Sequence, residues 1–575
     1  MIWYLGDLAR YQHELQEVQR LVVEADWLAG LQWRIDSRAR LCFDFEITVG
    51  AAIIPLTLRY GSSFPNTPPT IFPDPPQRLS EHQYQEADLC LEFGPDTWRP
   101  EVTGAELVRS AQRLLSGEAV AALDPTFLVP SRHQLTVGQS SRNDRVRFLG
   151  TVSLKQFLDE APSGRLANAT FRLQLQGFSA VFLVASIEGL NETAWLDPGL
   201  PAGIVEATSI NTGVVLKLPT DVAVPAIDHR EDLDAFLAAH GGTPSSVEPG
   251  TYQLVLLHTE IETRLFWIGK EGALLPATTL WATNGQRLDQ HHNGLATKTV
   301  GIVGCGSVGS KIATMLARGA VRGFLLVDDD PLFPENLVRH ELDWTDVGQH
   351  KADALANRLA LIAPNIQCTV RKQRLGGQES NTVADSTLQL LEKCDLIVDA
   401  TADATVFNLL SGAATAAAKP LVWAEVFGGG IGGLIARCRP QVDPAPQAMR
   451  ACIDAWYEAQ GVPAPRPTAH YGASTMGQPV PIVADDADVT VIAAHASRFA
   501  LDLLMERAPS AFPVSAYVIG LSAEWLFSQP FVTFPIDCGA APEAAPPAEI
   551  DNRPEIVAEI LKLVSESRDH PATTS

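Results

Sequence analysis

The sequence predicts a chain of several domains, the first two with α+β folds and the last a doubly wound α/β domain with a mostly parallel sheet. Its 575 residues exceed what one ordinary core holds, so three or four domains are expected. From about residue 295, short apolar runs alternate with glycine turns and helical segments, a pattern typical of parallel strands joined by helices. Upstream, alternating apolar segments with few helical stretches favour α+β folds.

Composition narrows the range of partners. Hydrophobic residues make up 46% and charged residues 19%, as in globular proteins. A formal net charge of −24 leaves no broad basic surface for nucleic acid. No segment reaches about 18 uninterrupted apolar residues, and the start of the chain resembles an amphipathic helix rather than a secretion leader. We therefore expect a cytoplasmic protein with no nucleic-acid or membrane partner.

Residues 1–130 are predicted to form the first domain. A helix over about 5–28 is followed by LCFDFEITV (41–49) and IPLTLRY (54–60), which alternate as antiparallel strands do. Proline lacks a backbone donor, so the Pro-rich stretch 64–76 is expected to be an extended surface connection. The run 104–117 then has helical spacing and a glycine stop.

Residues 145–290 are predicted to form an α+β middle domain. The apolar runs FSAVFLVASI, TYQLVLLHTEI and TRLFWIG indicate strands, and EDLDAFLAAHGG indicates a short helix. No group of residues in this region indicates a chemical role.

Residues 291–540 contain the strand–turn–helix pattern of the doubly wound domain. Its strands are expected in TVGIVG, GFLLVDDD, CDLIVDATADA and LVWAEVFGGGIGGLIARC. Residues 541–575 are rich in Ala, Pro and Glu around one short helical stretch, EIVAEILKLV, and are predicted to form a mobile tail.

The cysteines are too few and too scattered to form a disulfide framework. No CxxC motif or Cys/His pair has zinc spacing, so structural zinc is not expected. Any cysteine chemistry therefore depends on single residues. The eight are Cys42, Cys90, Cys305, Cys368, Cys394, Cys438, Cys452 and Cys538.

A glycine motif opens the last domain. Gly304, Gly306 and Gly309 form GxGxxG between a predicted strand and a predicted helix, where backbone amides can approach phosphates. Asp328 ends the next strand and could bind a ribose. These four residues fit both a dinucleotide-binding domain and an ATP-binding domain.

Three later elements favour ATP. Asn336-Leu-Val-Arg339, Gly348-Gln-His-Lys351 and Asp399-Ala-Thr401-Ala-Asp403 follow Asp328 in that order. Over about 285–540 the chain thereby resembles the adenylyltransferase family that includes ubiquitin-activating enzymes and their relatives in thiamine and molybdopterin biosynthesis. The fold implied is Rossmann-like, and the substrates implied are ATP with Mg²⁺ and a protein carboxyl terminus.

The resemblance assigns residues to this site. Asp328 would hold the ribose, Arg339 and Lys351 the triphosphate, and Asn336 belongs to the same motif. Charge that develops on the α-phosphate is what Arg, Lys and Mg²⁺ can offset. In the family's loop the threonine is followed at once by an aspartate, whereas here Ala402 lies between Thr401 and Asp403. The resemblance therefore implies an Mg²⁺ ligand in this loop, which is either Asp399 or Asp403. The resemblance further implies a homodimer, in which Arg287 would reach across to the partner's nucleotide.

Relatives in this family often carry a catalytic cysteine after the glycine-rich strand. Cys452 lies at about that place, and Cys538 near the domain's end is the alternative. A plain packing role is open for each. Cys305, inside the glycine turn, is expected only to pack.

A second resemblance covers residues 1–120. Phe64-Pro65-Asn-Thr-Pro68-Pro69, His82, Leu-Cys90-Leu and Trp98-Arg-Pro100 match in order the motifs of ubiquitin-conjugating enzymes. The resemblance makes Cys90 the thioester nucleophile. The usual His-Pro-Asn is His82-Gln83-Tyr84 here, so His82 or Tyr84 would have to stabilise the oxyanion in place of asparagine.

Together the two resemblances point to a fusion of activating and conjugating domains. Such bacterial fusions occur in CBASS-type antiviral operons and attach the C-terminus of a cGAS-like nucleotidyltransferase to an amine acceptor protein. Three alternatives stay open: a NAD(P)-dependent oxidoreductase, a sulfur-carrier adenylyltransferase that does not conjugate, and a non-catalytic scaffold.

Overall fold

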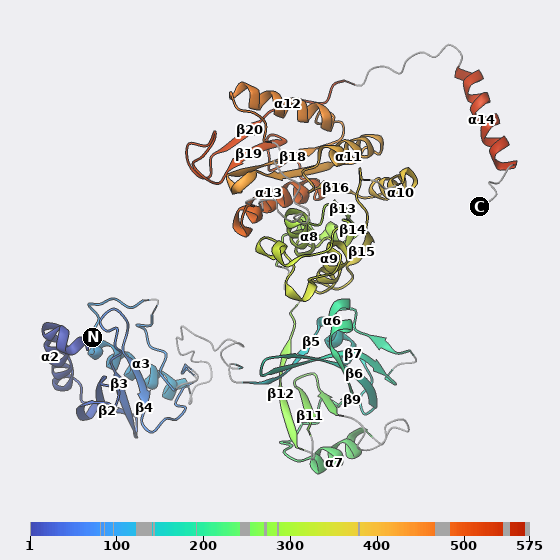
Figure 1. The fold of residues 1–575 in the computed structure, drawn as a ribbon. Helices are drawn as coiled ribbons and strands as arrows, with labels where there is room; N and C mark the ends of the chain where they lie inside the picture. Colours follow the sequence, from blue (N-terminus) through green and yellow to red (C-terminus); the bar gives the residue numbers. More distant parts are fainter. Residues whose placement is uncertain are drawn as a thin grey trace. The chain divides into compact units, whose positions relative to one another are not determined.

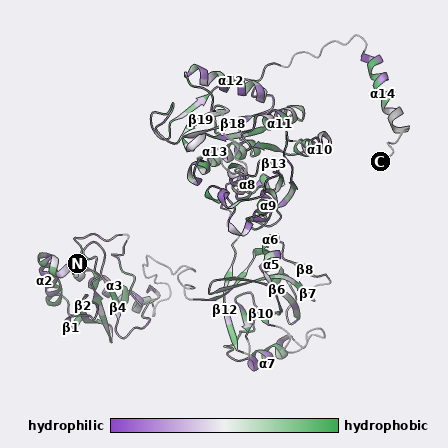
Figure 2. Ribbon diagram, in the orientation of Figure 1, coloured by the Kyte–Doolittle hydropathy of each residue, from purple (hydrophilic) through white to green (hydrophobic). Residues whose placement is uncertain are grey.

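The chain consists of two compact units, Met1–Arg145 and Val146–Ser575, each of which is described by itself (Figure 1). In Figure 2, hydrophobic residues line the strands of both units. None of the described helices is long and apolar enough to cross a bilayer. The computed structural model describes residues 2–80, 82–84, 87–95, 97–121, 141, 144–190, 193–241, 253–269, 273–283, 287–377, 380–465, 483–543 and 553–569.

The first unit is built on a four-stranded antiparallel meander with the order β1-β2-β3-β4. Its helices pack with the sheet into one core that includes Leu21, Phe43, Leu58 and Val108. The elements are α1 (Trp3–Gly6), α2 (Leu8–Glu24), β1 (Leu28–Ile35), β2 (Leu41–Val49), β3 (Ala52–Arg59), β4 (Thr70–Pro73) and α3 (Gly104–Ala121).

Two sequence expectations for this unit are wrong. Part of the Pro-rich stretch, Thr70–Pro73, forms the edge strand β4, and Ile71 is fully buried. An edge strand accommodates proline because its outer side carries no ladder hydrogen bonds. Gly117 does not end α3, because the helix continues for four residues to Ala121. The core contacts of Leu114 and Leu115 offset the cost of an interior glycine, about 1 kcal/mol.

The second unit begins with an eight-stranded sheet of order β5-β12-β11-β10-β9-β6-β7-β8. Strand β5 also pairs with β7, so this sheet closes on itself. The three expected strands are β7, β10 and β11, and the expected helix is α7. The elements are β5 (Val146–Gly150), α5 (Val152–Glu160), β6 (Leu166–Gln176), β7 (Ser179–Glu188), β8 (Trp195–Leu196), α6 (Ala202–Ala207), β9 (Ser209–Lys217), α7 (Arg230–Gly241), β10 (Leu254–His258), β11 (Thr263–Ile268) and β12 (Leu274–Trp281).

The last sheet has the order β15-β14-β13-β16-β17-β18-β19-β20. In the first half of this order, from β15 through β14, β13 and β16 to β17, neighbouring strands run parallel. From β17 to β20 neighbouring strands pair antiparallel, so the predicted parallel sheet occupies one half. The strands are β13 (Thr299–Val303), β14 (Gly323–Val327), β15 (Gln367–Arg371), β16 (Leu396–Asp399), β17 (Leu421–Val426), β18 (Gly432–Cys438), β19 (Ala516–Gly520) and β20 (Thr533–Ile536).

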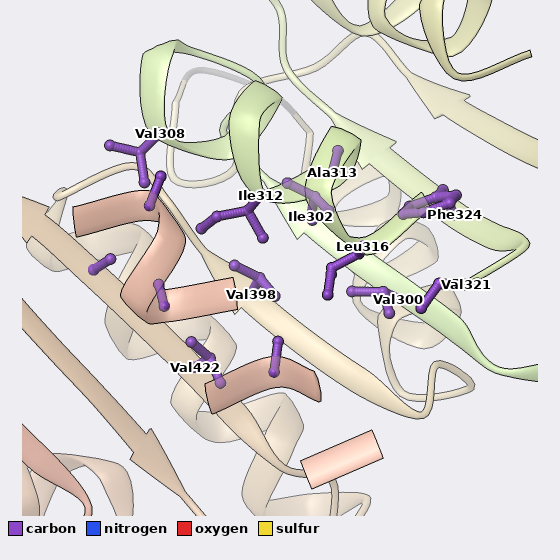
Figure 3. Packing of buried hydrophobic residues seen from close by; sticks show 14 of the residues in the cluster. Val300, Ile302, Val308, Ile312, Ala313, Leu316, Val321, Phe324, Val398 and Val422 are labelled. Carbon is purple, nitrogen blue, oxygen red and sulfur yellow. The ribbon is translucent and has the colours of Figure 1, made fainter. Parts of the chain in front are cut away.

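Helices cover both faces of this sheet, as a doubly wound fold requires. On one face α8, α9 and α13 pack against the strands, and Figure 3 shows Ile312 and Leu316 of α8 beside Val300 and Ile302 of β13. On the other face, α10, α11 and α12 form a second core. The helices are α8 (Ser307–Arg318), α9 (Lys351–Ala360), α10 (Asn381–Leu391), α11 (Ala404–Ala416), α12 (Pro446–Ala459) and α13 (Asp486–Leu504), with short 3₁₀ turns η2 (Gln290–Thr297), η3 (Pro334–Val338), η4 (Trp344–Asp346) and η5 (Gly428–Gly430).

The predicted tail contains one described helix, α14 (Arg553–Asp569), which extends beyond the expected stretch EIVAEILKLV at both ends. The expectation of mobility for 541–575 falls partly on residues outside those that the structure describes.

Candidate nucleotide and thiol sites

The candidate nucleotide site lies where the strand order of the last sheet reverses. Strand β13 is flanked by β14 on one side and by β16 on the other, although the chain visits β14 and β15 first. Ligands of open α/β sheets bind outside the carboxyl ends of the strands at such a switch point. Here those ends are the glycine turn after Val303, Asp328 after Val327, and Asp399, which pairs with Val303.

Two of the three motif glycines are required by the fold itself. Gly304 has φ +86°, a left-handed conformation, and packs against Ala400 and Thr401. A Cβ at Gly309 would lie 1.9 Å from the carbonyl oxygen of Gly304. Nothing lies within 4 Å of a Cβ placed at Gly306, the N-cap of α8. This open position leaves room for a phosphate to approach the backbone amides.

Asp328 ties the glycine turn to the end of β14. Its carboxylate accepts the Cys305 N–H at 2.7 Å and the Asp330 N–H at 2.9 Å. Burial raises its pKa, and the positive charge of Lys351 opposes that rise. Cys305 is fully buried, and burial next to Asp328 raises its thiol pKa, which agrees with the packing role expected for it.

His340 anchors the loop that carries Arg339. Its Nε2–H donates to the Cys305 carbonyl at 2.9 Å, while its Nδ1 accepts the Leu342 N–H at 3.2 Å. Burial lowers the pKa of His340 to about 4, so the ring is neutral and this tautomer persists at physiological pH. The residue that follows Arg339 is thus bonded to the glycine turn, which fixes the backbone of Arg339 close to that turn. Sequence reasoning missed His340, although it directly follows the Asn-Leu-x-Arg motif.

Lys351 lies at the same end of the sheet. Its N–H donates to the Asp330 carbonyl at 2.9 Å, and its ammonium group forms an ion pair with Asp330 Oδ2, also at 2.9 Å. The side chain is only 11% exposed. Lys351 is the first residue of α9, and its charge acts on the carboxylate of Asp328. The structure thus brings together the glycine turn, Asp328 and Lys351, which are far apart in the sequence.

Asn336 and Arg287 have different places. Asn336 lies in η3, where its Oδ1 accepts the Phe333 N–H at 3.0 Å, so its side chain shapes the turn before Arg339. Arg287 is exposed and precedes η2, and among the described residues it makes no contact with this site.

The acidic loop after β16 places both candidate metal ligands near the switch point. Asp399 is buried, and its Oδ1 accepts the Thr401 hydroxyl at 2.6 Å. Asp403 caps α11 by accepting the Thr405 N–H at 2.8 Å. Between them, Ala402 has φ +54°, a strained conformation for a residue with a Cβ. Burial, opposed by the Thr401 hydrogen bonds, raises the pKa of Asp399 to about 6, and the negative charge of Asp403 adds to the rise.

Two further ionisable residues face this loop, and sequence reasoning missed both. Glu425 of β17 has a pKa raised to about 7 by burial, and the nearby Arg450 of α12 opposes the rise. Their side chains lie 3.8 Å apart. A glutamate inside the apolar run LVWAEV is unusual enough to have been a signal. The pocket between these groups is lined by Asp399, Ala402, Asp403, Phe407, Trp423, Ala424, Glu425 and Arg450.

Cys452 and Cys538, the alternative relay cysteines, are neighbours in the structure. Cys452 lies on α12 and Cys538 follows β20, and each thiol contacts a backbone carbonyl close to the other cysteine. Burial, and then the neighbouring Cys452 thiol, raise the pKa of the Cys538 thiol to about 12.

In the candidate thiol site of the first unit, backbone hydrogen bonds connect Cys90 and its neighbour to His82 and to β4, and a separate hydrogen bond connects Trp98 to Pro65. The Leu89 N–H donates to the Ile71 carbonyl of β4 at 2.7 Å, and the Cys90 N–H donates to the His82 carbonyl at 2.9 Å. The indole N–H of Trp98 donates to the Pro65 carbonyl at 2.7 Å. Cys90 is partly exposed, as a nucleophile must be.

Gln83, which replaces the proline of the usual motif, organises this loop. It is buried, and its side-chain amide donates to the Gln77 and Ala87 carbonyls at 2.9 and 2.6 Å. Its Oε1 accepts the Leu79 N–H at 2.8 Å. The glutamine therefore ties the segment before His82 to Ala87, which precedes Cys90 by three residues. Tyr84 lies beyond it, with its N–H donating to the Asp88 carbonyl at 2.8 Å.

The glycine turn supports a test of nucleotide binding. Gly306→Ala adds a methyl group where the chain itself leaves space, so thermal stability should stay unchanged while affinity for ATP falls by roughly 10-fold or more. Gly309→Ala should instead lose about 1–3 kcal/mol of stability, because its Cβ collides with the backbone. Gly412→Ala, at an open position in α11, is the matched control. Calorimetric titration with ATP would contradict the assignment if Gly306→Ala bound like the unaltered protein.

Two family models match the chain. Residues 285–503 match the ThiF family, and residues 167–275 match the domain observed between E2 and E1 domains. The first range contains the glycine turn, Asp328, Arg339, Lys351 and the acidic loop.

Relatives of known name match shorter stretches. The ATP-dependent ubiquitin transferase-like protein Cap2 of Pseudomonas aeruginosa is 34% identical over 122 residues, which is 20% of each chain. The sulfur carrier protein ThiS adenylyltransferase of Escherichia coli is 30% identical over 130 residues, or 22% of this chain and 49% of that one. The matched stretches thus span between about a fifth and a half of these relatives.

Among solved structures, that of E. coli MccB with ATP is 16% identical, with a TM-score of 0.33, over 44% of this chain and 68% of that one. The two family models thus follow one another along the chain: the match to the ThiF family at residues 285–503 comes after the match to the domain observed between E2 and E1 domains.

Proposed function

We propose that the chain uses ATP to adenylate the carboxyl terminus of a protein. The carboxylate oxygen attacks the α-phosphorus, a mixed anhydride with AMP forms, and pyrophosphate leaves. The observation that carries the proposal is the convergence of the glycine turn, Asp328 and Lys351 at the switch point, beside the acidic loop of Asp399 and Asp403.

Each residue has a task in this step. The amides at the start of α8 and the ammonium group of Lys351 would hold the phosphates, and Arg339 would offset charge on the leaving pyrophosphate. Asp328 would bind the ribose, with its orientation fixed by the Cys305 and Asp330 amides. These groups hold the nucleotide still while its α-phosphate faces the incoming carboxylate.

The acidic loop suits Mg²⁺, which commonly takes one or two carboxylates together with phosphates and water. Asp399 is the better candidate, because the N-capping role of Asp403 already uses Oδ1 and Arg374 lies 3.7 Å from its Oδ2. The raised pKa of Asp399 fits a carboxylate that a cation would stabilise. When bound, Mg²⁺ would neutralise charge on the pyrophosphate.

We further propose that the acyl group then moves to Cys90. The thiolate attacks the acyl carbon and releases AMP, and an acceptor amine later attacks the thioester to give an amide and the free thiol. The path to Cys90 is either direct or through Cys452 or Cys538. His82, whose carbonyl accepts the Cys90 N–H, is the nearest candidate for assisting the second attack.

The partners belong to the same proposal. They are a protein whose C-terminus is activated, such as a cGAS-like nucleotidyltransferase in antiphage defence, and an amine acceptor protein. Support comes from the stretch shared with Cap2 and from the domain observed between E2 and E1 domains. Residues 1–130 would act as the conjugating domain, 291–540 as the adenylating domain, and a homodimer would place Arg287 near the partner's nucleotide.

Exchange of labelled pyrophosphate into ATP tests the proposal, because adenylation is reversible. Incubated with Mg²⁺, ATP and the protein encoded by the neighbouring gene, the chain should catalyse exchange that depends on that protein. Binding of NAD(P)H without exchange would favour an oxidoreductase instead. Exchange without any amide-linked product by intact mass would favour a sulfur-carrier adenylyltransferase.

A further inference from the structure

Cys452 and Cys538 lie between two backbone segments that hold both thiols. The Cys452 thiol contacts the carbonyl oxygen of Asp537 at 3.8 Å, next to Cys538 in the chain. In return, the Cys538 thiol contacts the carbonyl oxygen of Met449 at 3.9 Å, one turn before Cys452 on α12. These reciprocal contacts keep the two sulfur atoms side by side, although 85 residues separate them in the sequence.

The surroundings of the pair combine packing with access. Both cysteines are partly exposed, and both pack at the edge of the second core, beside Trp456 and Phe534. Packing restricts the positions of the two sulfurs, and partial exposure lets a small oxidant reach them. The four other cysteines of this unit differ, because Cys305, Cys394 and Cys438 are buried and Cys368 lies on β15. Cys452 and Cys538 thus form the pair that an oxidant can both reach and join.

We propose that Cys452 and Cys538 are a redox modification site, at which a peroxide closes a reversible disulfide. The Cys452 sulfur attacks one peroxide oxygen and the O–O bond breaks. Water leaves, and Cys452 becomes a sulfenic acid. The Cys538 sulfur then attacks that sulfur, and its proton leaves with the hydroxyl group as a second water. Two thiols are oxidised and one hydrogen peroxide is reduced to two waters. A dithiol reductant reverses the change by thiol–disulfide exchange.

The closed bond would join α12 to the segment after β20. Arg450, two residues before Cys452 on α12, reaches Glu425 beside the acidic loop, so the bond fixes the helix that carries this arginine. The disulfide would also withdraw both candidate relay thiols from acyl transfer. Its formation needs neither nucleotide nor acceptor and is therefore separate from the proposed ligation.

Peroxide treatment of the full-length reduced chain tests the site. After one equivalent of hydrogen peroxide and denaturation, titratable thiols should fall from eight to six per chain, and peptide mass spectrometry should find Cys452 linked to Cys538. The product should migrate as a monomer on a non-reducing gel, and dithiothreitol should restore all eight thiols.

Single substitutions separate this pair from general oxidation. Cys452→Ser and Cys538→Ser should each keep their seven remaining thiols under the same treatment, whereas Cys368→Ser should fall from seven to five. Mapping on the unaltered chain does not depend on how the variants fold. Linkage between different chains, sulfinic acid on either cysteine without a cross-link, or full alkylation of both after peroxide would each overturn the proposal.

Discussion

Replacing Lys351 by alanine should lower pyrophosphate exchange about 100-fold, which is the scale of losing one group that stabilises transition-state charge. Lys351 is 11% exposed and acts on Asp328 at the carboxyl ends of the parallel strands. The fold should tolerate the change, because the partner carboxylate of Asp330 is 54% exposed and can be hydrated. Initial exchange rates at saturating ATP, together with a thermal unfolding curve, provide the measurement.

Lys372→Ala is the matched control for this experiment. Lys372 forms an ion pair at 3.0 Å with Asp353, which lies on the helix that begins with Lys351. Both side chains of this pair are exposed. Its removal deletes the same charge from the same domain. Exchange should nevertheless stay within about 2-fold, because a surface ion pair contributes little energy. Equal losses in the two variants would assign the effect to overall charge, and no loss in either would place Lys351 outside the site.

The second large effect is expected at Cys90. Cys90→Ala should retain pyrophosphate exchange and abolish the amide-linked product, because the two chemistries belong to units with separate cores. Cys90→Ser should accumulate an oxygen ester that resists thiols, since a serine hydroxyl can accept the acyl group but passes it on slowly. Both products can be followed by intact mass with ATP, Mg²⁺ and the activated protein.

Cys42→Ala supplies the control within the same unit. Cys42 is 1% exposed on β2, and burial raises its thiol pKa, so it packs and does not react. The variant should lose some stability by leaving a small cavity, while conjugation proceeds. If Cys90→Ala still formed the amide, Cys90 would be a packing residue like Cys42.

The last domain was the most predictable part of the fold, for a physical reason. Its strands are buried on both faces, so each appears in the sequence as an apolar run that ends at a glycine or an aspartate, as in TVGIVG and CDLIVD. The antiparallel half was not predicted, because strand direction depends on the connections and not on composition. In the middle domain, strands such as β6 alternate with polar residues and gave a weaker signal.

Site residues were predictable when local motifs carried them. Gly304, Asp328 and Lys351 stand at motif positions, and the structure brings them together, while their roles stay predictions. His340 and Arg450 act through tertiary contacts with Cys305 and Glu425 that no spacing encodes. The same holds for Cys452 and Cys538, which only the packing of α12 against the end of β20 makes neighbours.

Strand β13 lies in the interior of its sheet, between β14 and β16, and this position affects when the domain can fold during synthesis. Residues 1–145 form a unit with its own core and can fold while the rest is still on the ribosome. Strand β13 leaves the ribosome early in its domain but must wait for β16, about 90 residues later, before its second edge is paired. During that interval an apolar strand edge is exposed. Nascent chains stalled before Leu396 should therefore be the ones that chaperones need to shield.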